Sequence, residues 1–373
     1  MTAPITAITM PKWGLTMTEG KVVKWLKPQG ASFAPGDEIL EIETSKITNV
    51  VEADAPGTLF RVVAPEGTTL PIGALLAVIA PEGTPAAEIE SFVSGFVVME
   101  PSDDSTTDAA AVAPRDLDVG GKRLRYLELG SGDGVPVLLV HGFGGDLNSW
   151  MFTQPVLAEG RRTIALDLPG HGGSIKDVGA GDADALTDVV ESTLTALGIE
   201  RAHLVGHSMG GAIVALLAAR KPERVASLTL ISPAGLGPEI NGAFIDGFVR
   251  ASRRKDAIEA LAMLVHDPAL VSRVMVEDVL RYKRLDGVTA ALETIAGAWF
   301  AGGRQARNLV AEITALGMPV QIICGRNDRI IPVAHAEALA SRLPVHILED
   351  VGHLPHMEKS GEVNRLIKGF IEP

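Results

Sequence analysis

A spacing of glycines that occurs twice near the N-terminus constrains the fold of this chain more than any other sequence feature. The glycines recur at a constant offset of 37 residues, first as Gly20, Gly30 and Gly36 and then as Gly57, Gly67 and Gly73. Each copy contains an alternating strand pattern, a Pro-x-Gly turn and a second strand after the third glycine. Glycines at such fixed positions usually mark turns that need a positive φ. The repeat therefore predicts that residues 1–80 form a small all-β barrel-sandwich domain with internal two-fold symmetry.

A lysine lies between the two copies, in a segment that has the pattern of a β-hairpin. Apolar and polar residues alternate on both sides of Thr44, Ser45 and Lys46, as they do in two paired strands. The pattern places Lys46 at or beside the tip of the hairpin, with its amine in solvent. On an arbitrary hairpin such a lysine is usually no more than a surface residue, so its role depends on the surrounding sequence.

The first domain resembles the lipoyl domains of 2-oxo-acid dehydrogenase complexes. The similar segments are residues 10–20, the turn at 36–38 and residues 43–46. In that family the tip lysine carries lipoate through an amide, so the resemblance implies lipoate on Lys46 and a lipoate-attaching enzyme that recognises it. This chain has Ser45 where the family usually has Asp. It lacks the methionines that flank the lysine of related biotin carriers, which favours lipoate over biotin.

The next segment, residues 81–117, has the composition of a linker. It is rich in Ala, Ser, Thr, Pro and acidic residues, which predicts an extended and mobile chain. A short patterned stretch at 86–98 has room for a helical turn or two. Such a tether holds a carried group near the following domain at roughly millimolar effective concentration.

Composition excludes several classes of partner and site. The formal net charge is −13 and the only cysteine is Cys324. The charge disfavours nucleic acid and anionic membranes, and one cysteine cannot form an internal disulfide. The sequence shows no signal peptide, no apolar run of the ~20 residues that a membrane span needs, and no cluster with metal-ligand spacing. We expect a cytoplasmic protein without a metal. The sequence leaves the oligomeric state open, and a homo-oligomer is one of the alternatives.

From about residue 118 to residue 373, strand patterns alternate with helix patterns. The buried strand patterns are residues 135–140, 163–167, 202–205 and 320–324. This alternation predicts a mainly parallel sheet with helices on both faces. A helical, partly apolar segment at about 237–307 interrupts the alternation, and we interpret it as a helical cap over the site.

The segment Gly206-His-Ser208-Met-Gly210 has the G-x-S-x-G pattern of a nucleophile elbow. A strand pattern precedes it and a helix pattern follows it, which is the context that this motif requires. Glycines two residues on either side make room for a strained turn that presents the serine hydroxyl above the sheet. The helix after the turn directs its free N–H groups toward developing negative charge. The sequence therefore predicts an α/β-hydrolase fold with Ser208 as its nucleophile.

A serine hydroxyl needs a base to take its proton, and α/β-hydrolases arrange the three groups in the order serine, acid, histidine. The strand at 320–324 is followed by Asp328, and His353 comes near the end of the chain. We predict that His353 is the base and Asp328 its partner. Asp350 is the rival acid and His356 the rival base.

Two backbone donors are expected to bind the oxyanion. One is the N–H of Met209, the residue after the nucleophile, and the other is the N–H of Phe143 in the loop at 141–145. His141 and His171 lie in loops where a structural role is more plausible than chemistry. His207 is expected to shape the elbow, and Cys324 to be an inert core residue.

The arrangement of the whole chain resembles the acyltransferase subunits of acetoin dehydrogenase systems. The similar segments include residues 10–20, 141–150, 165–172 and 235–242. The resemblance implies transfer of an acetyl group from the lipoyl arm to coenzyme A, with a thiamine-dependent enzyme and a dihydrolipoyl dehydrogenase as partners. The H-x-x-x-D-G signature of the usual acyltransferase domain is missing, so the hydrolase fold has to supply the chemistry.

Three functions remain open at this point. The first is a lipoyl-bearing acyltransferase that uses the Ser208, Asp328 and His353 triad. The second is a hydrolase of a thioester, ester or C–C bond that is tethered to a lipoyl domain. The third is a carrier subunit with a vestigial triad. The role of a basic cluster at 253–255 also has two alternatives: its side chains contact phosphates of coenzyme A, or they form a solvated helix face.

Overall fold

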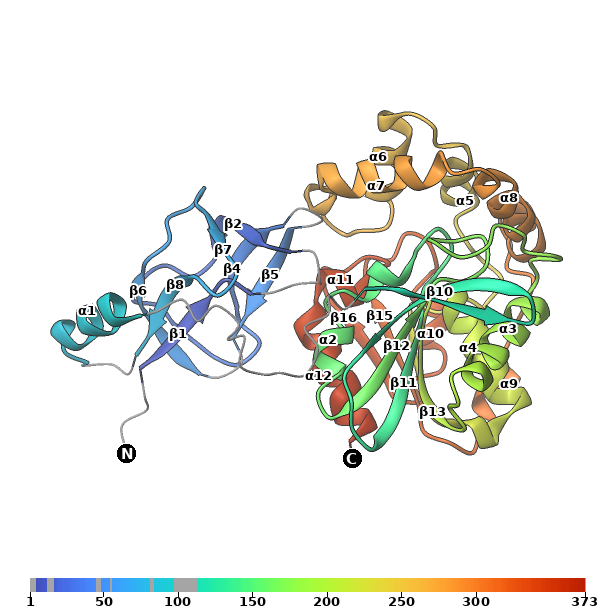
Figure 1. Ribbon diagram of the computed structural model, residues 1–373, viewed down its shortest axis with the longest axis horizontal. Coiled ribbons are helices and arrows are strands. Elements are labelled where there is room, and N and C mark those ends of the chain that lie inside the picture. The colour runs from blue at the N-terminus through green and yellow to red at the C-terminus, as the bar shows by residue number, and fades with distance from the viewer. Residues whose placement is uncertain are drawn as a thin grey trace. The chain divides into compact units, whose positions relative to one another are not determined.

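The computed structural model describes residues 5–11, 17–44, 48–53, 56–80, 84–96 and 113–372. The chain divides into two compact units, Met1–Ala111 and Val112–Pro373, coloured blue and green to red in Figure 1. Each unit has its own hydrophobic core, and each is described below by itself.

The first unit consists of two four-stranded antiparallel sheets. One sheet has the strand order β1-β8-β6-β3 and the other β5-β4-β2-β7. Their strands are β1 (Thr6–Thr9), β2 (Glu19–Trp25), β3 (Ser32–Phe33), β4 (Glu38–Glu43), β5 (Thr48–Glu52), β6 (Gly57–Val62), β7 (Thr69–Pro71) and β8 (Leu75–Ile79). Side chains from both sheets, such as Val22, Leu40, Leu59 and Leu76, are buried in one core. This arrangement confirms the predicted all-β sandwich.

The glycine repeat has a direct counterpart in the backbone. Gly30 and Gly67 have φ values of 91° and 85°, which only glycine adopts without strain. The N–H of Gly30 donates to the Leu59 carbonyl at 2.7 Å, and the N–H of Gly67 donates to the Val22 carbonyl at the same distance. Each turn is thus bonded to the strand of the other copy, which is the two-fold symmetry that the repeat predicts.

The first glycine of each copy serves packing. A Cβ on Gly57 would lie 2.6 Å from Ile79 Cγ2, and a Cβ on Gly20 would lie 2.6 Å from Met10 Sδ. Both glycines therefore let a strand approach the core side chains closely, although neither has a positive φ. The repeat in the sequence combines two physical requirements, which are turn conformation and close contact.

Strands β4 and β5 form the predicted hairpin and pair Glu43 with Thr48. Lys46 lies between these paired residues in the sequence but outside the described residues, as do the neighbouring Ser45 and Ile47. The position of Lys46 in the hairpin connection therefore follows from the strands on both sides of it.

Part of the predicted linker is folded. Helix α1 (Ala86–Gly95) is longer than the turn or two expected within residues 81–117. Ile89 is buried in a cluster with Leu75 and Val78 of β8, and Phe92 packs on this cluster. The three-residue spacing of Ile89 and Phe92 places both on one face of the helix, so this part of the linker is not extended.

The second unit contains one eight-stranded sheet with the order β16-β15-β14-β13-β11-β12-β10-β9. Strands β11 to β16 are parallel to one another, whereas β10 is antiparallel to both of its neighbours, β12 and β9. The strands are β9 (Arg115–Val119), β10 (Lys122–Leu129), β11 (Gly134–Val140), β12 (Arg161–Leu166), β13 (Ala202–His207), β14 (Val225–Ile231), β15 (Val320–Gly325) and β16 (Val345–Leu348). Strand β9 begins inside the predicted linker, three residues before the expected domain start at 118.

Helices cover both faces of this sheet, as Figure 1 shows. Those on one face include α3 (Ala183–Ala196), α4 (Met209–Arg220) and α9 (Val310–Thr314), and those on the other include α2 (Gln154–Leu157), α11 (Pro355–Glu358) and α12 (Ser360–Ile371). The short helices η1 (Leu147–Trp150), η2 (Pro222–Arg224) and α10 (Ala334–Glu337) complete the core unit. The sheet is consequently buried between two clusters of apolar side chains, one on each face.

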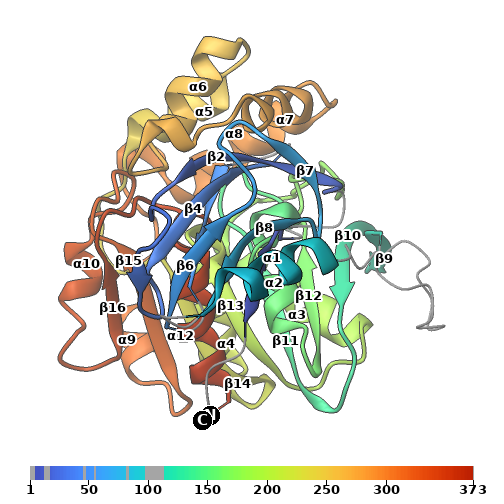
Figure 2. The ribbon, with the colours of Figure 1, turned by 90° about the vertical axis from the view of Figure 1, so that its left-hand side faces the viewer.

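The segment predicted as a cap is helical. It contains α5 (Gly242–Arg250), α6 (Arg254–Ala262), η3 (Pro268–Leu270), α7 (Arg273–Lys283), α8 (Val288–Trp299) and η4 (Ala301–Gly303). Figures 1 and 2 both show α5 to α8 gathered at one end of the sheet. The predicted α/β-hydrolase fold with a helical cap is confirmed.

The glycine repeat leads to a test of the first unit. We expect Gly67→Ala to lower the free energy of unfolding by about 1 kcal/mol, because its φ is positive although the surrounding space is open. Gly57→Ala should cost about 2–3 kcal/mol through contact with Ile79. Hydrogen exchange of peptides from residues 17–44 during a denaturant titration measures both effects.

Gly95→Ala is the matched control, since Gly95 ends α1 and nothing lies within 4 Å of its added Cβ. It should leave stability unchanged or slightly raised. Equal losses in all three variants would contradict the separate roles of turn conformation and packing.

Candidate active site

Ser208 occupies a strained turn between β13 and α4. Strand β13 ends at His207, and helix α4 begins at Met209. Ser208 itself has φ 52° and ψ −119°, a conformation that costs a non-glycine residue about 1–3 kcal/mol. The side chain is almost fully buried. The predicted nucleophile is therefore held in an unfavourable backbone conformation by the structure around it.

The two glycines of the motif make this turn sterically allowed. A Cβ on Gly206 would lie 2.5 Å from the Gly210 carbonyl oxygen. A Cβ on Gly210 would collide with the carbonyl oxygens of Val140 and His141 at the end of β11. Helix α4 can thus begin directly against the neighbouring strand, which brings its N-terminus to the site.

His353 and Asp328 form a close buried pair. The distance between His353 Nδ1 and Asp328 Oδ2 is 2.7 Å, and both side chains are 2% exposed. The other carboxylate oxygen, Oδ1, accepts N–H groups from Ile330 at 2.8 Å and Ile331 at 3.0 Å. Because these bonds fix the carboxylate, Asp328 orients the His353 ring and favours its Nδ1–H tautomer, which leaves Nε2 as the basic nitrogen.

The two rival residues lie in other environments. The Asp350 side chain is 81% exposed, and its Oδ1 lies 3.8 Å from Nε2 of His266. His356 is fully buried, its ring is stacked on Trp150 and His207, and neither ring nitrogen has a hydrogen-bond partner within the described residues. Burial lowers the pKa of His356 to about 3. Geometry therefore favours Asp328 and His353 over these alternatives.

A half-buried glutamate that no sequence pattern singles out, Glu358, holds the His353 loop. The Glu358 carboxylate accepts N–H groups from Gly352 at 3.0 Å, Leu354 at 3.2 Å and, from the cap segment, His266 at 2.7 Å. The N–H of His353 itself donates to the Leu264 carbonyl at 2.7 Å. Two hydrogen bonds thus join the cap segment to the loop of His353, one from the His266 N–H to Glu358 and one from the His353 N–H to Leu264.

His207 supports His353 from the elbow. Its Nε2–H donates to the His353 carbonyl oxygen at 2.9 Å, and the two ring centroids are 4.8 Å apart. Burial lowers the pKa of His207 well below its usual value, so the ring is neutral. This contact joins the residue beside Ser208 to the backbone of His353, in agreement with the expected shaping role of His207.

The segments that carry the predicted oxyanion donors, Phe143 and Met209, both adjoin Ser208. A Cβ on Gly142 would lie 2.9 Å from Ser208 Cβ, so the loop that carries Phe143 abuts the serine. Among the described residues, neither the Phe143 N–H nor the Met209 N–H has a backbone acceptor.

The Phe143 ring is held by aromatic contacts. Its centroid lies 6.0 Å from that of Phe248 and 5.9 Å from that of Phe300, both in edge-to-face geometry. Phe248 belongs to cap helix α5, and Phe300 follows α8. The cap therefore packs against the loop that carries the predicted second oxyanion donor.

His141 and His171 connect two loops. Leu168 N–H donates to His141 Nε2 at 3.1 Å, and Gly144 N–H donates to His171 Nε2 at 3.1 Å. The Nδ1–H groups donate to the carbonyls of Gly142 and Pro169. Burial lowers the pKa of both histidines. Both therefore act as neutral structural groups, as expected from their place in loops.

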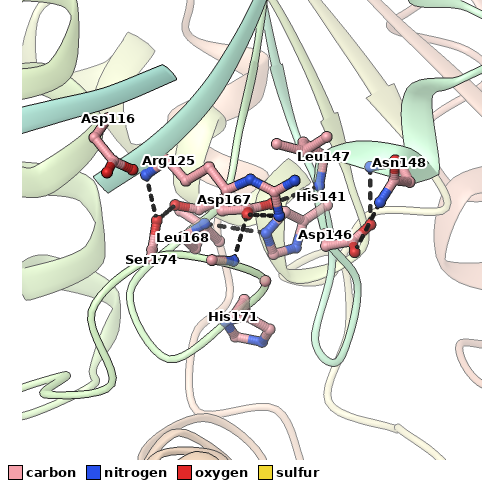
Figure 3. A network of polar contacts seen from close by, with 12 residues as sticks. Asp116, Arg125, His141, Asp146, Leu147, Asn148, Asp167, Leu168, His171 and Ser174 are labelled. Carbon is pink, nitrogen blue, oxygen red and sulfur yellow. Dashed lines mark hydrogen bonds and ion pairs between the residues drawn. The ribbon is translucent and has the colours of Figure 1, made fainter. Parts of the chain in front are cut away.

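Asp167 is the centre of the network drawn in Figure 3. The carboxylate is fully buried and accepts N–H groups from Leu147 and Gly173, each at 2.7 Å. Arg125 lies 3.6 Å from it. Burial raises the pKa of Asp167 to about 6. Its hydrogen bonds tie the loop after β12 to η1, and the sequence analysis missed this role because the partners are far apart in the chain.

The remaining sequence candidates have structural explanations. In the basic cluster, Arg253 pairs with Asp256 at 3.0 Å, Arg254 with Glu277 and Lys255 with Glu259, each at 3.7 Å. These are solvated ion pairs on a helix surface, which favours the solvated-face interpretation. Cys324 is buried in β15, and burial raises the pKa of its thiol.

No helix in the described part of the chain is long and apolar enough to cross a membrane. No group of three or more His, Cys, Asp or Glu side chains in the same residues is arranged to hold a metal ion.

Comparison with known proteins gives matches over both units. Residues 6–79 match the family model of biotin-requiring enzymes, and residues 135–360 match that of the α/β-hydrolase fold. The chain is 46% identical to the dihydrolipoyllysine-residue acetyltransferase component of the acetoin cleaving system of Pseudomonas putida, over 98% of both chains. The corresponding component from Cupriavidus necator is 43% identical over 98% of this chain and 96% of its own.

The second unit alone is similar to hydrolases. A 2-hydroxymuconate semialdehyde hydrolase from a Pseudomonas species is 31% identical over 65% of this chain and 88% of its own. A solved serine hydrolase from Cycloclasticus zankles is 26% identical with a TM-score of 0.63, over 70% of this chain and 98% of the other. A solved membrane phospholipase A is 29% identical with a TM-score of 0.60, over 70% of this chain and 86% of its own.

The buried pair predicts the reactivity of Ser208. We expect Asp328→Asn to slow phosphonylation of Ser208 by a fluorophosphonate by about 10³–10⁴-fold, because an amide stabilises the wrong histidine tautomer. Asp350→Asn is the matched control and should change the rate less than twofold, since its side chain is exposed. Mass spectrometry of the labelled peptide measures both rates; a larger loss in the control would assign the acid to Asp350.

The buried His356 predicts a pH dependence of stability. Its folded pKa of about 3 lies below the ordinary value of 6.5, so the unfolded chain binds one more proton between these values. The free energy of unfolding should therefore fall as the pH drops from 6.5 toward 3, by up to about 1.4 kcal/mol per pH unit for this group. His356→Phe should make the slope shallower while it retains the ring stacking.

Urea unfolding at several pH values between 4 and 7 measures this slope, with wild type as the reference. Unchanged labelling of Ser208 in His356→Phe would verify that the site is intact. An identical slope in both proteins would contradict a neutral buried His356.

Proposed function

The chain belongs to the family of dihydrolipoyllysine-residue acetyltransferase components of acetoin cleaving systems, and we propose how it transfers the acetyl group. It is an acyltransferase with a lipoyl-type carrier domain and an α/β-hydrolase unit. Ser208 receives the acetyl group from the carrier and passes it to coenzyme A. The observation that carries this proposal is the fixed pair of Asp328 and His353 in a chain that matches acetyltransferase components over 98% of its length.

Lys46 is the residue that would hold lipoate. The strands on both sides of it pair Glu43 with Thr48, so the lysine lies in the short connection of a hairpin that the fold leaves at its edge. A lysine in a hairpin connection fits the amide attachment of a long arm. The bound dithiol would supply the acetyl group as a thioester.

Acyl transfer to the enzyme uses the serine and the histidine. Ser208 Oγ attacks the thioester carbonyl carbon while His353 Nε2 takes the hydroxyl proton. The C–S bond then breaks, and His353 returns the proton to the departing sulfur. The products are an acetyl ester on Ser208 and a free thiol. Asp328 stabilises the imidazolium during this exchange through its 2.7 Å contact with Nδ1.

The negative charge of the tetrahedral intermediate needs donors that are already in place. The N–H groups of Phe143 and Met209 are proposed for this role because their loops meet at Ser208. The loss of one such donor typically raises the barrier by about 3–4 kcal/mol. Since both donors are backbone groups, a side-chain substitution at Phe143 or Met209 affects oxyanion binding only if it moves the backbone of that segment.

Deacylation runs through the same groups. His353 Nε2 takes the proton of the coenzyme A thiol, and the sulfur attacks the acetyl carbon. The ester bond breaks, acetyl-coenzyme A leaves and Ser208 regains its proton. Water would enter the same step in a hydrolase, and the similarity of the second unit to hydrolases makes it the second candidate acceptor.

The family membership supports further proposals about the surroundings of the protein. A thiamine-dependent component is proposed to load the arm, a dihydrolipoyl dehydrogenase to reoxidise it, and a lipoate-attaching enzyme to modify Lys46. We propose a cytoplasmic location for this assembly, where those enzymes and coenzyme A are present together.

Transfer through the serine can be tested with lipoylated protein that carries acetyl on the reduced arm. Wild type should form acetyl-coenzyme A, and Ser208→Ala should lose at least 10³-fold of this activity because the nucleophile is missing. Acetyl-coenzyme A and free acetate are measured with and without coenzyme A. Release of acetate at the same rate in both conditions would identify a hydrolase and reject the transfer.

Lys46→Arg separates the carrier from the catalytic unit. This variant cannot bear lipoate, so it should lose transfer from its own arm. It should retain transfer from free acetyl-dihydrolipoamide to coenzyme A, since the Ser208 site is unchanged. A variant with unaltered transfer from its own arm would place the lipoyl group elsewhere.

A further inference from the structure

A pocket of about 630 Å³ lies on the second unit, away from the residues of the triad. Three of its lining side chains are basic, namely Arg123, Arg125 and Lys176. Its size falls in the range of small-molecule and cofactor sites, about 300–1,000 Å³. The lining comes from strand β10, from the loop after β12, from Leu285 between cap helices α7 and α8, and from Asp116 of β9, which is its one acidic side chain.

The Arg125 guanidinium has donors to offer in this pocket. It is one-third exposed, and its ion pair with Asp167 spans 3.6 Å, which is longer than a hydrogen bond. Among the described residues no acceptor is hydrogen-bonded to it, whereas both Asp167 oxygens already accept backbone N–H groups. Figure 3 shows Arg125 beside Asp167 and Ser174. A Cβ on Gly173 would collide with the Arg125 side chain, so that glycine is required for this placement.

The other two cations add positive charge. Lys176 Nζ donates to the carbonyls of His171, Gly172 and Ser174, so it contributes charge and no free donor. Burial lowers the pKa of Lys176, and the nearby Arg123 and Arg125 charges lower it further against the opposing effect of Asp167. Arg123 is exposed and is paired with Asp116 at 3.1 Å. The pocket therefore gathers cations that repel one another.

The pocket lies at the same edge of the sheet as the nucleophile. The loop after β12 and the turn at Ser208 both follow the carboxyl ends of strands that run parallel to β11. Arg125 lies on β10, and β12 and β11 lie between β10 and β13, so the pocket and the turn are about three strand spacings, or roughly 15 Å, apart in the sheet. A ligand that has phosphates at one end and a thiol at the other can span such a separation.

We propose that this pocket binds the phosphate groups of coenzyme A, with Arg125 as the main donor and with Arg123 and Lys176 supplying charge. Planar guanidinium groups bind phosphate oxygens through paired, charge-assisted hydrogen bonds. A chain with a net charge of −13 repels a polyphosphate ligand elsewhere, so a local excess of cations is required. The assignment rests on the proposed transfer to coenzyme A. In the cluster at 253–255 each cation has a carboxylate partner, as Arg123 has with Asp116. The Arg125 guanidinium, by contrast, has no hydrogen-bonded acceptor among the described residues, so the pocket fits this role better.

Binding is tested directly in Ser208→Ala protein, which cannot turn over the acceptor. Calorimetric titration uses adenosine 3′,5′-bisphosphate, coenzyme A, pantetheine and inorganic phosphate. We expect Arg125→Gln to weaken binding of the bisphosphate and of coenzyme A about tenfold or more. Arg123→Gln should weaken it several-fold, and added salt should weaken it in the parent protein. Pantetheine binding should be unaffected by both substitutions.

Arg115→Gln is the matched control. Arg115 is an exposed arginine on β9 outside the pocket lining, 4.0 Å from Glu128, and its loss should change binding less than twofold. Equal affinity of the bisphosphate for Arg125→Gln, Arg123→Gln and the parent protein would overturn the site. Inorganic phosphate that binds as tightly as the bisphosphate would overturn its assignment to coenzyme A.

Turnover in the Ser208 protein separates this proposal from the proposed function. In Arg125→Gln the KM for coenzyme A should rise about tenfold, whereas the rate with pantetheine as acceptor should stay within twofold. Tight binding of the bisphosphate through Arg125 without any acetyl transfer would reject the transferase function and retain the site. Transfer to coenzyme A with an unchanged KM in Arg125→Gln would retain the function and reject the site.

Discussion

The close contact between the start of helix α4 and the end of strand β11 is the constraint on which the active site depends. Gly210 lies against the carbonyls of Val140 and His141, and no side chain fits there. This contact forces the chain through a sharp turn, and Ser208 has to accept a positive φ. The same contact brings the free N–H groups of the helix to the site, where such groups stabilise negative charge.

The groups around Ser208 are fixed mainly by polar bonds, and most of these involve neutral histidines or carboxylates that are at least half-buried. His141 and His171 join the loops after β11 and β12, and Glu358 joins the cap to the His353 loop. Each of these bonds would be lost on exposure to water, because solvent competes for the same donors and acceptors. The bonds that preorganise the site therefore also hold the cap in place. The Phe143 ring adds a contact with Phe248 of the cap.

The two units contribute different properties to the proposed transfer. The first unit is a small sandwich whose symmetric turns leave a hairpin connection for the carrier lysine. The second unit is proposed to supply the nucleophile, the base and the oxyanion donors. A hydrolase fold becomes a transferase when the acceptor thiol is bound beside the acyl-serine more effectively than water. The cationic pocket at Arg125 and Lys176 is the proposed means of binding that acceptor.

The sequence by itself determined the features that depend on local geometry. The glycine repeat determined the sandwich, because positive φ and close strand contacts require glycine at fixed positions. The motif around Ser208 and the order of the acid and the base determined the hydrolase fold. Lys46 could be placed in a hairpin from alternation alone.

Only the tertiary structure decided how residues distant in the chain meet. It placed Asp328 beside His353 and left Asp350 in solvent. It also showed that α1 is folded, because Ile89 is buried against β8. Asp167, Glu358 and the Arg125 pocket carry no local signature, since a buried carboxylate or a cation cluster is defined by partners from several strands and loops. Such partners follow from packing, which the pattern of neighbouring residues does not encode.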